Sequence, residues 1–138
     1  MTTGGILVVD DRDNWRNLLV LILQEEGYEV ETADSYTAAI QILQRTLCHL
    51  AVIDVRLIDS AASNADGLRL IAAIEENRWP TAVIAITGYG RAAYENNPVL
   101  KSPRVKAFLG KREFDNIQFL NLVAKSVAAS AVTSNEPR

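Results

Sequence analysis

The sequence predicts an α/β domain in which five parallel strands form a doubly wound sheet with helices on both faces. Short apolar runs rich in β-branched residues alternate along the chain with longer segments whose apolar residues recur at helical spacing. Strands that are apolar throughout are typical of a parallel sheet buried on both faces, in which right-handed crossovers join consecutive strands. We therefore expect a flavodoxin-like sheet with strand order 2-1-3-4-5.

The first half of the chain supplies two strands and two helices. A buried strand is predicted at residues 6–9, and a helix at residues 13–26 that Gly27 ends. The second strand, residues 28–33, is polar on one side, which suits an edge of the sheet. Ser35 is expected to cap the helix that follows.

The second half continues the same alternation. Buried strands are predicted at residues 50–53, 82–86 and 105–109, and Asp66 with Gly67 leads into the third helix. The segment 89–104 is weakly patterned and contains two prolines, which cannot continue a helix. The fourth helix is therefore expected to be short or irregular.

The last helix is predicted from one apolar stripe, which consists of Phe114, Ile117, Leu120, Ala124 and Val127. Phe119 and Leu122 lie outside this stripe. We interpret them as apolar surface for a protein partner. Deeper burial of the whole helix is the alternative.

Composition is typical of one globular domain of 138 residues with 49% hydrophobic residues and a net charge of −3. We expect the domain at residues 6–128, after a flexible start (1–5) and before a polar tail or linker (129–138). The scattered Lys and Arg residues give no nucleic-acid footprint, and the apolar runs are too short for a membrane span. No signal-peptide pattern is seen, so a cytoplasmic location is expected. The only cysteine, Cys48, excludes an internal disulfide.

Four predicted strands end in charged or hydroxyl residues: Asp10 and Asp11, then Asp54, Thr87 and Lys111. In a doubly wound sheet the carboxyl ends of the strands border the functional crevice. Each residue also has an ordinary interpretation, as a helix cap, a loop or turn residue, or a solvated lysine. The full set at the correct strand ends favours one shared site.

The residue types at these strand ends suit phosphoryl chemistry. Three carboxylates that lie close together repel one another unless they share protons or hold a cation. Oxygen ligands without His or Cys favour Mg²⁺. An aspartate beside such an ion can attack phosphorus, while Lys111 and Thr87 offer a positive charge and a hydroxyl to phosphoryl oxygens.

From about Ile6 to Val127 the sequence resembles the receiver domain of bacterial two-component response regulators. The resemblance is carried by the stretches Ile6–Asp11 with Arg16 following, Ala51–Leu57, Ile84–Gly88 and Phe108–Lys111. It implies a signalling domain, not a conventional enzyme, that catalyses its own phosphorylation on Asp54. The donor would be a sensor histidine kinase or a histidine phosphotransfer protein.

The resemblance also implies roles for individual residues. Mg²⁺ would be held by Asp10, Asp11, Asp54 and the main-chain carbonyl of Arg56. Phosphorylation would bias a two-state switch in which Thr87 and Phe108 move together; a core strand residue is the alternative for Phe108. The downstream protein stays unknown, and the domain would be a monomer or a phosphorylation-linked dimer.

The chain departs from the usual receiver pattern at three places in two loops. Arg112 stands where a proline normally follows the lysine, and Ile58 stands near the place of another proline. Residues 59–65 form a longer loop than usual, interpreted as a surface insertion. Arg56 and Tyr89, two residues beyond Asp54 and Thr87, are expected to overhang the site and prolong the phosphoryl lifetime; the alternative is that both are ordinary residues of the rim.

Two other functions are compatible with parts of the pattern. Asp11-Arg12-Asp13 after an apolar strand resembles the start of a haloacid dehalogenase-type phosphatase using Asp11, although a further acidic pair and a cap are missing. A receiver-like scaffold that binds without phosphorylation is the other alternative. The complete set of strand-end residues argues against it.

Overall fold

Five parallel strands form one sheet in the order β2-β1-β3-β4-β5, as the sequence predicts. The computed structural model describes residues 5–56, 66–88, 92, 94 and 96–129. The strands are β1 (Gly5–Val9), β2 (Glu29–Ala33), β3 (Leu50–Asp54), β4 (Ala82–Thr87) and β5 (Val105–Gly110). The helices are α1 (Asp13–Glu25), α2 (Tyr36–Arg45), α3 (Asp66–Glu76) and α4 (Asn116–Ala129), with the 3₁₀ helix η2 (Pro98–Lys101).

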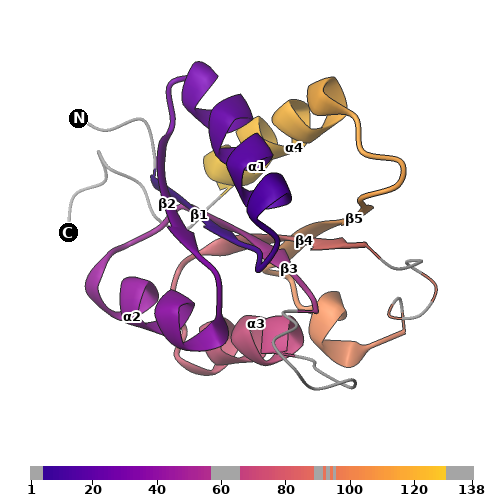
Figure 1. The fold of residues 1–138 in the computed structure, drawn as a ribbon. Coiled ribbons are helices and arrows are strands. Elements are labelled where there is room, and N and C mark those ends of the chain that lie inside the picture. The colour runs from indigo at the N-terminus through magenta and orange to yellow at the C-terminus, as the bar shows by residue number, and fades with distance from the viewer. Residues whose placement is uncertain (1–4, 57–65, 89–91, 93, 95, 130–138) are drawn as a thin grey trace.

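Helices cover both faces of the sheet, α1 and α4 on one side and α2 and α3 on the other (Figure 1). Side chains alternate along a strand, so β1 contributes residues to the hydrophobic core on each face of the sheet. Ile6 and Val8 pack with α1 and α4, and Leu7 and Val9 pack with α2 and α3. The central strand β3 is buried along its whole length. Its apolar run is therefore explained by burial on two faces.

Two local sequence signals have the expected structures. Gly27 ends α1 with a φ of 93°, a left-handed conformation that favours glycine. The Ser35 hydroxyl accepts a hydrogen bond from the amide of Ala38 at 3.2 Å, so Ser35 caps α2. Element boundaries differ from the predicted ones by only one or two residues.

The predicted buried stripe of the last helix is correct only in part, because Phe114, Leu120 and Val127 pack against the core whereas Ile117 and Ala124 are exposed. In α4 the buried residues are Phe119, Val123 and Ser126, whereas Ile117 is 72% exposed. Phe119 is fully buried against the core beneath α1 and α4, and Leu122 packs against the same core. The interpretation of these two residues as a partner surface is therefore wrong. The helix carries apolar residues around most of its circumference, so periodicity alone did not determine its buried face.

The connection between β4 and β5 contains η2 and no α-helix among its described residues (92, 94 and 96–104). A short or irregular fourth helix is thus confirmed for this part. Glu75 of α3 holds the connection, because its carboxylate accepts hydrogen bonds from the Ser102 hydroxyl at 2.7 Å and the Arg104 guanidinium at 3.2 Å. Residues 57–65, with the predicted loop insertion, and Tyr89 lie outside the described residues, as do the two chain ends.

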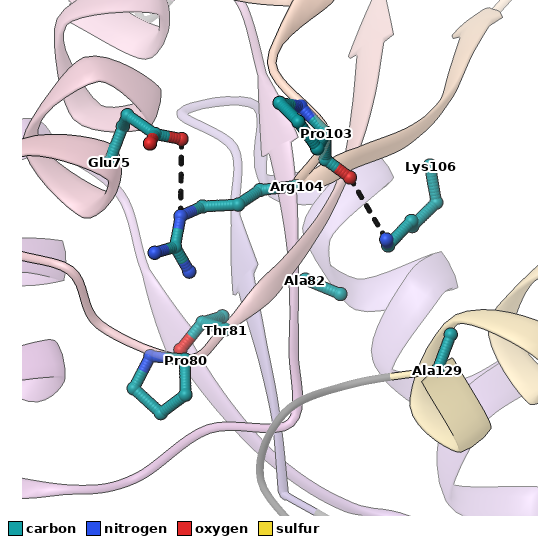
Figure 2. Close-up of a pocket in the computed structure, with 8 residues that line it drawn as sticks. All are labelled: Glu75, Pro80, Thr81, Ala82, Pro103, Arg104, Lys106 and Ala129. Atoms are coloured by element: carbon teal, nitrogen blue, oxygen red, sulfur yellow. Dashed lines mark hydrogen bonds and ion pairs between the residues drawn. The ribbon is translucent and has the colours of Figure 1, made fainter.

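A cavity of about 320 Å³ lies where β4 and β5 begin (Figure 2). Glu75 and Arg104 line it as an ion pair, and Lys106 donates to the carbonyl of Pro103. None of the predicted site residues lines this cavity, because they stand at the opposite ends of the strands. In the described part of the chain, no helix has both the length and the apolar character needed to span a membrane.

Gly67 fixes the distance between α3 and the end of β3. A Cβ atom at this position would lie 2.0 Å from the Asp54 carbonyl oxygen and 2.5 Å from the Val55 Cα, both backbone atoms. We therefore expect Gly67→Ala to lower the free energy of unfolding by roughly 1–3 kcal/mol or more, because the two backbones must move apart. Urea denaturation measures the change.

The matched control is Gly5→Ala, where the nearest atom to a new Cβ is the Leu47 carbonyl oxygen at 3.9 Å. We expect this variant to change stability by less than about 0.5 kcal/mol. Equal effects of the two substitutions would show that close packing at Gly67 is not the cause.

Candidate functional site

Asp10 lies directly after β1 and is fully buried. Its amide donates to the carbonyl of Ala33 at 3.1 Å, which extends the pairing with β2 by one residue. One carboxylate oxygen accepts from the Arg12 amide at 3.0 Å, and the Arg16 guanidinium donates to the Asp10 carbonyl at 2.9 Å. These hydrogen bonds fix the position of the Asp10 carboxylate at the start of the turn that connects β1 to α1.

Asp54 is the last residue of β3 and is held in a similar way. Its Oδ1 accepts a hydrogen bond from the Arg56 amide at 3.0 Å. The amide of Val55 donates to the carbonyl of Ile86 at 2.9 Å, so β3 and β4 stay paired to the edge of the site. Only 3% of Asp54 is exposed. The local hydrogen bonds therefore orient a buried carboxylate.

Lys111 reaches both buried carboxylates from the end of β5. Its Nζ lies 2.8 Å from Asp10 Oδ2 and 3.0 Å from Asp54 Oδ2, and its side chain is 6% exposed. Its amide donates to the carbonyl of Thr87 at 2.8 Å, which fixes where the lysine leaves the sheet. The lysine occupies the predicted site although Arg112 takes the place of the usual proline.

The predicted acidic cluster is present. Asp10, Asp11 and Asp54 each offer a carboxylate oxygen, and these oxygens lie within 4.8 Å of one another. Three ionised carboxylates and the Lys111 ammonium leave an excess of two negative charges (3 − 1 = 2), which a divalent cation would balance. The all-oxygen donor set fits Mg²⁺.

Burial is the main influence on the charge of Asp54. It raises the pKa of this carboxyl from its ordinary value of 3.8 to about 6, and the neighbouring Asp10 carboxylate adds to the increase, whereas Lys111 opposes it. Without a cation, Asp54 therefore holds its proton to higher pH than an exposed aspartate does. A cation at the cluster would favour the ionised form.

Thr87 and Phe108, the predicted switch pair, lie on adjacent strands. Thr87 ends β4, is fully buried, and pairs with Gly110. Phe108 stands two residues before Gly110 and is half-buried against the core under α2 and α3. Because side chains two apart on a strand share a face, Thr87 and Phe108 point to the same side of the sheet.

A pocket of about 380 Å³ opens over the carboxyl end of β3, and its lining is Arg12, Trp15, Asp54, Arg56, Gly88, Lys111 and Arg112. Lys111 Nζ lies 5.1 Å from the centroid of the Trp15 ring. Sequence reasoning did not assign Arg12 or Arg112 to the site. A signal for both was present, since each directly follows a residue at a strand end.

The geometry argues against the haloacid dehalogenase-type arrangement. That arrangement needs Asp11 and Asp13 to face the site together. The Asp13 carboxylate is instead 81% exposed and pairs with Arg16 on the surface of α1. The buried carboxylates that Lys111 contacts are Asp10 and Asp54.

Comparison with known protein families gives a match to the response regulator receiver domain over residues 6–118. The chain belongs to this family, the receiver domains of two-component response regulators. The receiver domain also resembles a CheY-like receiver protein of Methanospirillum hungatei, with 25% identity and a TM-score of 0.77. That match covers 91% of this chain and 94% of the other. The predicted family and fold are therefore confirmed.

Two further relatives bear on function. The photosynthetic apparatus regulatory protein RegA of Rhodobacter capsulatus is 32% identical over 64% of this chain, a match that spans 46% of RegA. The receiver domain thus spans under half the length of this relative. The response regulator TrrA of Thermotoga maritima, whose structure is a complex with Mg²⁺ and BeF, has 27% identity and a TM-score of 0.74, over 90% of this chain and 99% of TrrA.

The raised pKa of Asp54 predicts a pH dependence of stability in metal-free buffer. The folded-state pKa of about 6 lies above the unfolded value near 3.8, so the folded protein binds this proton more tightly. Asp54 therefore contributes most stability at low pH and loses it as pH rises through about 6. We expect Asp54→Asn to be more stable than the unaltered protein by on the order of 1–3 kcal/mol at pH 7, with the difference closing towards pH 4.

Urea denaturation in EDTA at a series of pH values checks this expectation. Asp34→Asn, a substitution of an exposed aspartate outside the site, is the matched control and is expected to show no such gap. A stability difference for Asp54→Asn that is constant with pH, or larger at low pH, would contradict the explanation.

Proposed function

We propose that this receiver domain accepts a phosphoryl group on the Asp54 carboxylate, at a site that also binds Mg²⁺. One observation carries the proposal: Asp54 is buried beside two further aspartates, with the Lys111 ammonium 3.0 Å from its Oδ2. An isolated buried carboxylate would be costly, and this one is surrounded by the charges that phosphoryl transfer requires. Membership of the receiver family supports the same conclusion.

Each residue has a distinct task in the proposed reaction. Asp10, Asp11, Asp54 and the main-chain carbonyl of Arg56 would hold Mg²⁺, which when bound offsets charge on the transferred group. An Asp54 oxygen attacks phosphorus, and the bond from phosphorus to the donor atom breaks with its electron pair leaving on the donor. The Lys111 ammonium binds a phosphoryl oxygen, and the Thr87 hydroxyl donates to another.

The domain itself supplies these groups, so it catalyses its own phosphorylation once a donor arrives. We propose a sensor histidine kinase or a histidine phosphotransfer protein as the donor, which places the domain in the cytoplasm with the ATP that kinases use. The RegA relative is longer than the segment it shares with this chain. The identity of the downstream partner does not follow from the site.

Phosphorylation would shift an equilibrium between two conformations of β4 and β5. The phosphoryl group would form new contacts with the Thr87 hydroxyl and with the Lys111 ammonium. The Lys111 amide also donates a hydrogen bond to the Thr87 carbonyl, so the two residues would move together. Phe108 shares the face of Thr87 and is only half-buried, so it has room to change its packing. The signal would thus leave the site along the two last strands. A phosphorylation-linked dimer is one form the output could take.

The test is the intact mass of the protein after incubation with acetyl phosphate and Mg²⁺. We expect a gain of one phosphoryl group that is abolished by Asp54→Asn and reduced more than about a hundredfold in rate by EDTA, because the metal contributes several kcal/mol to such reactions. Asp13→Asn is the matched control. It removes an exposed carboxylate and is expected to leave the gain intact.

The outcomes separate the three candidate functions. A gain that survives Asp54→Asn but is lost in Asp11→Asn would favour the phosphatase arrangement, in which Asp11 takes the phosphoryl group. No gain in a folded protein that binds Mg²⁺ would favour the scaffold that acts without phosphorylation.

A further inference from the structure

Three arginines from three different loops surround the pocket over Asp54. Arg12 follows β1, Arg56 follows β3 and Arg112 follows β5, and all three line the pocket together with Lys111. Asp54 is the only acidic residue in that lining. Arg12, Arg56 and Arg112 are here called the arginine rim. A cationic opening thus lies above an acidic floor, in a chain whose net charge is −3.

The two exposed arginines of the rim differ from most other arginines of the protein. Four arginines elsewhere lie against carboxylates: Arg16, Arg45, Arg69 and Arg104. Arg12 and Arg112 form no ion pair with any residue in the described ranges 5–56, 66–88 and 96–129. No direct ion pair within the described part of the fold therefore neutralises these two charges.

The pocket strengthens the effect of these charges. Arg12, Arg56, Arg112 and Lys111 share one recess of about 380 Å³, of which Trp15 forms one wall. Clefts lined by charge of one sign focus the potential and raise the local concentration of ions of opposite sign. The planar fork of a guanidinium also matches the oxygens of a phosphate.

We propose that the arginine rim selects the phosphodonor by charge, so that strongly anionic donors such as acyl phosphates react faster than donors of lower charge. This inference rests on the proposed function of Asp54. In the reaction with acetyl phosphate, an Asp54 oxygen forms a bond to phosphorus. The bond from phosphorus to the acyl oxygen breaks, and its electron pair leaves with acetate. The rim binds the anionic donor before this step and exchanges no proton.

The experiment compares two small donors of different charge. Acetyl phosphate is largely a dianion near neutral pH, whereas phosphoramidate, with its protonated nitrogen, is a monoanion. We measure Asp54 phosphorylation rates by intact mass with saturating Mg²⁺, at low ionic strength and at physiological ionic strength. The variant is Arg12→Gln with Arg112→Gln, which leaves the Arg56 main-chain carbonyl in place. The control is Arg45→Gln, an exposed arginine on α2 outside the site.

At low ionic strength we expect the double variant to lose about tenfold in rate with acetyl phosphate and about threefold with phosphoramidate, because the attraction scales with donor charge. Salt should shrink both losses to about twofold or less, since it screens exposed charges. Arg45→Gln should match the unaltered protein with both donors. Urea midpoints measured on all variants confirm that they are equally folded.

A second readout does not depend on phosphorylation. Trp15 lines the pocket, so its fluorescence in a Trp79→Phe background reports the binding of inorganic phosphate. We expect phosphate to bind several-fold more weakly to the double variant. Equal phosphate binding, or an unchanged ratio of the two donor rates, overturns the inference and leaves the proposed function standing. Failure of both donors to modify Asp54 in the unaltered protein overturns the proposed function and this inference together.

Discussion

The Lys111 ammonium between two buried carboxylates is the interaction on which the site depends. Asp10 and Asp54 end neighbouring strands and are almost entirely removed from water. Burying either charge alone costs several kcal/mol, and placing two together adds their repulsion. Lys111 Nζ lies 2.8 Å from the Asp10 carboxylate and 3.0 Å from the Asp54 carboxylate, so it offsets both costs. It also connects the ends of β1, β3 and β5. The remaining negative charge is what makes the site suitable for a divalent cation.

The same lysine couples the site to the rest of the domain. Its amide is bonded to Thr87, and its ammonium lies over the Trp15 ring. Trp15 packs edge-on against Phe114, with 5.3 Å between the ring centroids. Phe114 packs in turn against the buried Phe119, with 5.1 Å between the centroids. A change of charge at Asp54 therefore acts on a residue that contacts both the last strands and the core beneath α4. Packed cores respond to such changes as discrete shifts.

The strand-end site could be predicted because its convergence follows from topology. Parallel strands end on one edge, so Asp10, Asp54 and Lys111 had to meet there once the strand order was correct. The buried face of α4 could not be predicted from the sequence. Apolar residues lie around most of this helix, so Phe119 and Ile117 were equally plausible as buried residues. Of the arginine rim, only Arg56 was expected at the site. Arg12 and Arg112 were not assigned to it, because a position next to a strand end does not show whether a side chain lines the pocket.

The most direct test of the account is a crystal structure of the receiver domain with Mg²⁺ and beryllofluoride, which mimics a phosphoryl group. We predict beryllium bonded to one Asp54 oxygen, Mg²⁺ on Asp10, Asp11, Asp54 and the Arg56 carbonyl, and Lys111 Nζ moved onto a fluorine. Mg²⁺ bound elsewhere, or beryllofluoride on another carboxylate with Lys111 still between Asp10 and Asp54, would contradict it.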